Sequence, residues 1–320
     1  MFINNIKQKY YDNLLERLVN TENLDQVKST LQDLADSNNQ HYQSIALKYL
    51  FILLEKDKFK KIFNQNIIWV NSFDIGDTDY LNNFINFILS KNNIISDPPN
   101  TYAFYLNQVA KKINKNNLNF KDIVDFTYLY QYLISKNEDT IKIINSSGAF
   151  FETELKRYFT HFNFTRAYFY IVRNPLNIFA LRKNKNPNVE TSEHFYGLLS
   201  SDTDYIKKFH FNDNIIEENT QNWSTNVTSW ANPNATSTFR GFILKYEDLA
   251  SDPKQILAEV IGHLVQASFK IELNYEHIEE FISQHSLDKD EVDTSDVSNK
   301  ELKLLRRDLG DISKKFGYVI

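Results

Sequence analysis

The chain has 320 residues, a net charge of −5 and no cysteine. A chain of this length can build one large domain, or one domain with a small appendage. The lack of cysteine excludes disulfides, thiolate metal sites and thiol nucleophiles. The negative charge balance leaves no basic footprint for nucleic acid, so we expect none as a partner.

The sequence also bears on where the protein is found. Residues 1–11 carry Asn, Lys and Gln rather than an apolar run, which argues against a signal peptide. No stretch approaches the ~20 apolar residues that a membrane helix needs. We therefore expect a cytoplasmic protein without a membrane span.

Residues 1–65 predict a helical N-terminal extension. Apolar side chains recur at helical spacing over 24–34 and again over 42–53, and each pattern places one apolar stripe on a helix. Such stripes are too large to leave in water. We expect the extension to pack on the rest of the chain or on a second copy of it, as a homo-oligomer contact.

The pattern changes at Ile67 to short apolar runs of the kind that form buried parallel strands. These runs are 67–70, 140–144, 167–172 and 242–246. Helical spacing is found over 80–88, 101–137, 253–265 and 302–316. Strands that alternate with helices predict an α/β fold with a central parallel sheet flanked by helices, over residues 66–320.

Four segments of residues 66–320, in order, resemble the bacterial branch of the sulfotransferases that use 3′-phosphoadenosine 5′-phosphosulfate (PAPS). The family's first segment is a loop of the form Ser-Tyr-Pro-Lys-Ser-Gly-Asn-Thr-Trp-Leu, and later segments read Lys-Thr-His-Asn, Arg-Asn-Pro-Leu-Asp and Arg-Tyr-Glu-Asp-Leu. The matching segments here are Ser72–Leu81, Lys142–Asn145, Tyr170–Asn177 and Leu244–Leu249. The resemblance implies a P-loop-like sulfotransferase fold, and it leaves residues 1–65 uncovered.

The resemblance also implies a chemistry, the transfer of a sulfuryl group from PAPS to a hydroxyl or amine acceptor. Oriented N–H donors at a helix N-terminus and a loop lysine would stabilise the charge on the leaving phosphate, and a histidine would take the acceptor's proton. The positions implied for binding PAPS or its product adenosine 3′,5′-bisphosphate (PAP) are Ser72, Gly76, Thr78, Tyr80, Arg173 and Tyr246. Lys142 is the candidate catalytic cation.

Several of these positions have alternative explanations. Arg173 would grip the 3′-phosphate or form an ion pair with a nearby acid. Tyr80 and Tyr246 would lie at the adenine or serve as core aromatics. Lys142 would neutralise a phosphate or be a solvated lysine at a strand end, and His161 would be a surface or core histidine or a replacement base.

The chain departs from the family where the sulfuryl group should be held. Ile75 takes the place of the loop lysine, Ile144 that of the histidine, and Leu181 that of a serine that accompanies Arg173. The segment Ser283–Asp296 is acidic where the family has a basic, glycine-bearing loop, so we expect it to be a solvated loop.

The first loop is acidic as well, with Asp74, Asp77 and Asp79. Such acids satisfy free N–H groups at a helix start, or they bind Mg²⁺ or Ca²⁺, although the spacing does not match an EF-hand. Beside a phosphosulfate they would repel it.

These changes favour a sulfotransferase-family protein with lost or strongly reduced transfer that acts by binding, its acceptor or protein partner unknown. We expect PAPS or PAP to bind weakly if at all. The alternative is an active sulfotransferase with an atypical donor site. A third class, the P-loop nucleotide kinases, is disfavoured because their Gly-Lys-Ser/Thr signature is absent.

Overall fold

The structure is a computed structural model, and it describes residues 20, 23–36, 40–74, 78–113, 115, 117–136, 140–152, 157–199, 201, 205–287 and 292–320. Ile75, Gly76 and Asp77, to which the sequence assigns roles in the first loop, lie outside these residues. So do residues 288–291 of the acidic segment. None of the helices among these described residues combines the length and the apolar character that a membrane span requires.

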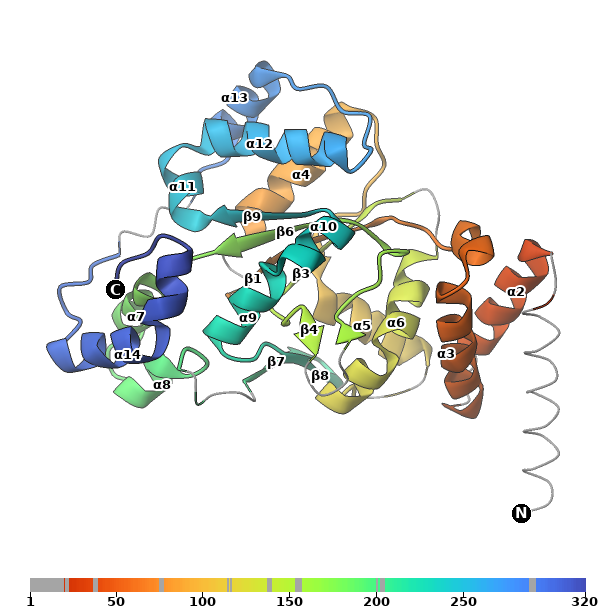
Figure 1. Ribbon diagram of the computed structural model, residues 1–320, viewed down its shortest axis with the longest axis horizontal. Helices are drawn as coiled ribbons and strands as arrows, with labels where there is room; N and C mark the ends of the chain where they lie inside the picture. Colours follow the sequence, from red (N-terminus) through yellow and green to blue (C-terminus); the bar gives the residue numbers. More distant parts are fainter. Residues whose placement is uncertain are drawn as a thin grey trace, which may run out of the picture.

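A five-stranded parallel sheet forms the centre of the molecule, in the order β2-β3-β1-β6-β9 (Figure 1). The strands are β1 (Ile67–Ser72), β2 (Asn100–Thr101), β3 (Lys142–Ser146), β6 (Thr165–Val172) and β9 (Gly241–Lys245). All four predicted strands are confirmed, and so is the α/β class. The edge strand β2 was not predicted, because two residues carry no periodic pattern.

Helices cover both faces of this sheet (Figure 1). One face carries α4 (Asp79–Lys91), α11 (Tyr246–Ser251), α12 (Pro253–Gln266) and α13 (Tyr275–Gln284). The other carries α5 (Tyr102–Lys112), α6 (Phe120–Ser135), α9 (Trp223–Trp230) and α10 (Pro233–Phe239). Successive side chains of β1 point to opposite faces of the sheet. Ile68 and Val70 therefore pack in the core under α4, and Ile67 and Trp69 pack in the core on the opposite face.

Smaller elements complete the second face and both ends of the molecule. An antiparallel hairpin of β7 (Ile206–Phe211) and β8 (Asn214–Asn219) packs on α5 and α6, and a short ladder joins β4 (Phe151–Glu152) to β5 (Arg157–Tyr158). At one end of the molecule lie α7 (Pro175–Lys185), α8 (Thr191–Phe195) and α14 (Asn299–Lys315) (Figure 1). The helix predicted over 101–137 is two helices, because Asn119 and Asp122 form a capping box that starts α6.

The described helices of the N-terminal segment pack on the α/β core. They are α2 (Leu24–Ala35), α3 (Gln40–Leu54) and the 3₁₀ helix η1 (Asp57–Ile62). Their apolar side chains belong to the same core cluster as α5 and α6, and Phe51 of α3 lies 5.6 Å from Tyr128 of α6, ring centre to ring centre. Asp36 at the end of α2 pairs with Lys112 at 2.5 Å and with Lys136 at 2.9 Å. The segment therefore contacts its own chain; whether it also contacts a second copy stays a prediction.

Gly241, at the start of β9, is required by a close approach to its neighbouring strand. A Cβ at this position would lie 2.1 Å from Cζ of Tyr168, whose hydroxyl donates to the carbonyl of Trp230 at 2.6 Å and so fixes the ring. We expect Gly241→Ala to lower the free energy of unfolding by about 1–3 kcal/mol, the usual cost of overpacking.

A matched control comes from Gly262, in the middle of α12, where a Cβ meets nothing within 4 Å. Gly262→Ala is expected to raise stability by up to ~1 kcal/mol through helix propensity alone. Urea unfolding of both variants measures the two changes. A stable Gly241→Ala protein would show that Tyr168 can move aside.

Candidate active-edge cavity

The strands β1, β6 and β9 end at the same edge of the sheet. Ser72 pairs with Ile171, and Val172 pairs with Lys245, so the residues that follow each strand emerge side by side. Phe73 and Asp74, which follow β1, therefore lie at the same, carboxyl edge of the sheet as Arg173. This is the edge at which open α/β sheets bind ligands.

A cavity of about 670 Å³ lies at this edge. Six residues singled out from the sequence line it together: Asp74, Asp79, Tyr80, Arg173, Leu181 and Tyr246. The other lining residues include two basic groups that the sequence analysis missed, Arg182 and Lys185 on α7, and His285 from the segment after α13. A size of this order suits a small-molecule ligand.

Arg173 lies against an aromatic ring of the cavity wall. Its guanidinium carbon lies 4.0 Å from the ring centre of Tyr246, in a cation–π contact. Both side chains are largely buried. Tyr80 packs edge-on against Phe281 at 5.1 Å, and burial raises the pKa of its hydroxyl. Tyr80 and Tyr246 thus belong to the core and line the cavity at once.

Two cations offset the charge of Asp74. Its carboxylate lies 3.6 Å from Nζ of Lys207 and 3.9 Å from Nη2 of Arg182. Lys207 also donates to the carbonyl of Phe73 at 2.7 Å. Burial lowers the pKa of Lys207, and Asp74 acts against that shift. The repulsion that the sequence suggests for Asp74 is therefore reduced, because this carboxylate shares its charge with two basic groups.

Ser72 and Thr78 brace the first loop rather than face the cavity. Both are fully buried; Ser72 donates its hydroxyl to the carbonyl of Asp74, and Thr78 accepts from Nδ2 of Asn145 at 3.1 Å. Thr78 stands at the N-cap of α4. Asp79 follows in the first turn, and burial raises the pKa of its carboxyl.

Lys142 lies away from the other predicted residues. It is the first residue of β3, opposite Ile67 at the start of β1, which puts it four residues, or roughly 13 Å, from the carboxyl end of its strand. Its Nζ donates to the carboxylate of Asp97. The structure therefore does not bring Lys142 to the cavity, and Ile144 lies within the buried strand.

The carboxyl end of β3 instead contacts a buried acid, Glu218, that the sequence did not reveal. Glu218 of β8 is 4% exposed, and it accepts from the hydroxyl of Ser146, from N of Ser147 at 3.2 Å and from Oγ of Ser147 at 2.9 Å. The usable signal was the Asn212-Asp213 turn between two strand-like segments, which marks a hairpin. Glu218 then falls on the same buried face of β8 as Ile216.

His161 lies at the other edge, just before β6. Its ring packs 4.3 Å from Phe162 and 5.7 Å from Tyr128, and Nδ1 accepts from N of Asn163 at 3.2 Å. Burial lowers its pKa from 6.5 to about 4. His161 is therefore a neutral, half-buried histidine, and it does not reach the cavity as a base.

The lowered pKa of His161 predicts that the folded protein becomes less stable in acid. As pH falls from 6.5 to about 4, the unfolded chain binds a proton at His161 that the folded chain does not, so stability declines. We expect a loss of about 2 kcal/mol from this residue over that window. In His161→Asn, whose Oδ1 keeps an acceptor for Asn163, this part of the pH dependence should disappear. Urea unfolding at pH 7.5, 6 and 4.5 measures it, and identical profiles would contradict the assignment.

No group of three His, Asp or Glu side chains among the described residues could hold a metal ion. The later acidic segment is partly tied down, since Asn184 donates to the carbonyl of Asp293 at 3.2 Å and Lys183 to that of Asp296 at 2.7 Å.

The fold and the cavity define a class: an α/β protein with a parallel sheet and a mixed-charge pocket at its carboxyl edge. No protein-family model matches the chain, and no curated protein matches it.

Proposed function

We propose that this chain is a sulfotransferase-like protein that binds an adenosine bisphosphate-type ligand weakly and has lost efficient PAPS-dependent transfer. The observation that carries the proposal is the meeting of Tyr80, Arg173 and Tyr246 in one cavity at the carboxyl edge. These are the residues that the family resemblance assigns to the adenine and the 3′-phosphate.

The charge around the cavity supports an anionic ligand. Arg173, Arg182 and Lys185 line it, and the acids among its described lining residues are Asp74 and Asp79. Asp74 already shares its charge with Arg182 and Lys207. A guanidinium can hold a phosphate through two parallel hydrogen bonds, which suits Arg173 for the 3′-phosphate.

The groups that would carry out transfer are displaced or replaced. Lys142 is bound to Asp97 at the far end of its strand. Ile144 and Ile75 have no charge and no proton to exchange, and His161 lies at the opposite edge. Loss of both a cation and a base favours a binding function over catalysis.

The second candidate is an active sulfotransferase with an atypical donor site that acts on a hydroxyl or amine. The observation in its favour is Glu218, a buried carboxylate at the carboxyl end of β3, where the family places its base. Purified protein should turn over PAPS with phenol, sugar or amine acceptors at background only. A robust rate that Glu218→Gln abolishes would establish this candidate instead.

Binding is tested by titrating PAP into the purified protein and following the heat or ligand-observed NMR. We expect a Kd in the millimolar range, and no detectable binding by Arg173→Gln, because a charge-assisted contact is worth ~1.5–3 kcal/mol. The matched control is Arg307→Gln, which removes an exposed guanidinium paired with Asp308. Micromolar binding by the unmodified protein, or unchanged binding by Arg173→Gln, would contradict the proposal.

A further inference from the structure

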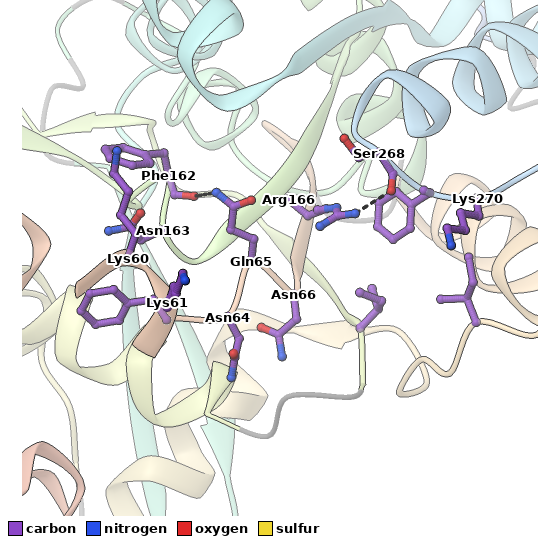
Figure 2. A pocket seen from close by; sticks show the side chains of 14 residues that line it. Lys60, Lys61, Asn64, Gln65, Asn66, Phe162, Asn163, Arg166, Ser268 and Lys270 are labelled. Atoms are coloured by element: carbon purple, nitrogen blue, oxygen red, sulfur yellow. Dashed lines mark hydrogen bonds between the residues drawn. The ribbon is translucent and has the colours of Figure 1, made fainter. Parts of the chain in front are cut away.

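A second cavity, of about 830 Å³, lies at the amino edge of the sheet. Its walls come from the end of η1, the entry to β1, the turn before β6 and the segment after α12 (Figure 2). Arg166, at the start of β6, belongs to this cavity, whereas Arg173 follows the end of the same strand. Seven residues of strand separate them by roughly 23 Å, so the two cavities are distinct.

The lining of this amino-edge cavity is basic. Lys60, Lys61, Arg166 and Lys270 line it, and none of its described lining residues is acidic. Figure 2 shows Lys60 and Lys61 at one end, Lys270 at the other and Arg166 between them. Lys60 is partly neutralised by Asp57 at 2.8 Å. In a chain of net charge −5, this is a local concentration of positive charge.

Polar donors reinforce this charge at the inner wall. Arg166 donates Nη2 to the carbonyl of Ser268 at 2.6 Å and lies 4.9 Å from the ring of Phe269, which fixes its guanidinium. Nε of Arg166 and Nδ2 of Asn163 are buried, and neither has an acceptor among the residues described. Burial and the nearby charge of Arg240 lower the pKa of Arg166. An anion in the cavity would accept hydrogen bonds from these donors and would stabilise the charged form of Arg166.

We propose that this amino-edge cavity binds a small polyanion carrying two or more phosphate or sulfate groups. Cations at both ends and in the middle suit a ligand whose charge is spread along its length, whereas a single phosphate would reach one end only. Exposed Lys61 and Lys270 supply mobile ammonium groups for the ends. Arg166, held by Ser268 and Phe269, supplies the fixed central contact. This site does not depend on the function of the carboxyl-edge cavity.

Calorimetric titration of the full chain at low ionic strength tests the proposal. Inorganic tripolyphosphate represents a phosphate source and a heparin-derived sulfated disaccharide a sulfate source, with inorganic phosphate for comparison. We expect at least one polyanion to bind more tightly than phosphate, and the tighter one identifies the source. Lys61→Glu and Lys270→Glu should each weaken that binding about tenfold.

Two variants control for charge and for location. Lys303→Glu makes the same charge change on the exposed face of α14 and should leave binding unchanged. Arg173→Gln should leave it unchanged as well, because that residue lines the other cavity. The proposal is overturned if neither polyanion binds, if Lys61→Glu and Lys270→Glu have no effect, if Lys303→Glu weakens binding equally, or if Arg173→Gln removes it.

Discussion

Glu218→Ala is expected to lower the free energy of unfolding by about 3 kcal/mol, because it leaves buried donors without acceptors. The carboxylate receives hydrogen bonds from the hydroxyls of Ser146 and Ser147 and from N of Ser147. These donors sit at the end of β3, where 4% exposure of Glu218 leaves little room for water to replace it. The substitution would also remove the side-chain hydrogen bonds that join β8 to the end of β3.

Two variants separate this effect from general damage to the hairpin. Glu217, the preceding residue, pairs with Lys208 at 3.2 Å on the surface, so Glu217→Ala should cost less than about 1 kcal/mol. Glu218→Gln keeps one acceptor oxygen, so its loss in the free energy of unfolding should be intermediate between those of the two alanine variants. Urea unfolding measures all three, and equal losses at 217 and 218 would show that the buried hydrogen bonds add nothing.

The sheet could be predicted from the sequence because its strands are buried on both faces. Runs such as Ile67–Val70 and Ala167–Val172 are apolar at every position, a pattern that surface segments do not show. The hairpin of β7 and β8 was not predicted, since lysine, glutamate and asparagine interrupt the apolar residues of its strands. The hairpin is buried because it packs against α5 and α6, and these contacts between distant segments leave no local pattern in the sequence.

The candidate site was predictable where it follows strand ends. Arg173 and Tyr246 come directly after β6 and β9, so parallel pairing alone brings them together. Lys142 could not be placed in the same way, because its position depends on where β3 begins and ends. In the family the matching motif follows a strand, which would put Lys142 at a strand end, yet β3 begins at Lys142 and runs on to Ser146. Each residue of strand moves a side chain by about 3.3 Å, so four residues carry Lys142 to the opposite edge.

Arg182 and Lys207 could not be assigned to the site from the sequence. Neither belongs to a segment that resembles the family, and both reach Asp74 only through the packing of α7 and β7 around the first loop. Long-range pairing of this kind has no local pattern in the sequence. These two cations nonetheless reduce the negative charge that the first loop presents to a ligand, because they lie beside the carboxylate of Asp74.

The double variant Ile75→Lys with Asp77→Gly is expected to bind PAP more tightly than the unmodified chain. Both positions lie between Asp74 and Thr78, in the loop that the family resemblance assigns to the 5′-phosphate. One substitution adds a positive charge and the other removes a negative one. Together they should tighten PAP binding about thirtyfold, or ~2 kcal/mol, from two charge changes near the phosphate.

The control for this gain is Ile75→Met, a long side chain without charge, which should leave PAP affinity unchanged. Adding Arg173→Gln to the double variant should remove most of the binding, since the 3′-phosphate would lose its bidentate partner. Calorimetry at two ionic strengths measures each step, and the gain should shrink with salt because it is electrostatic. If the double variant binds PAP no better than the unmodified chain, then the cavity no longer serves a bisphosphate. In that case Arg173, stacked on Tyr246, holds the carboxyl edge together as a structural residue.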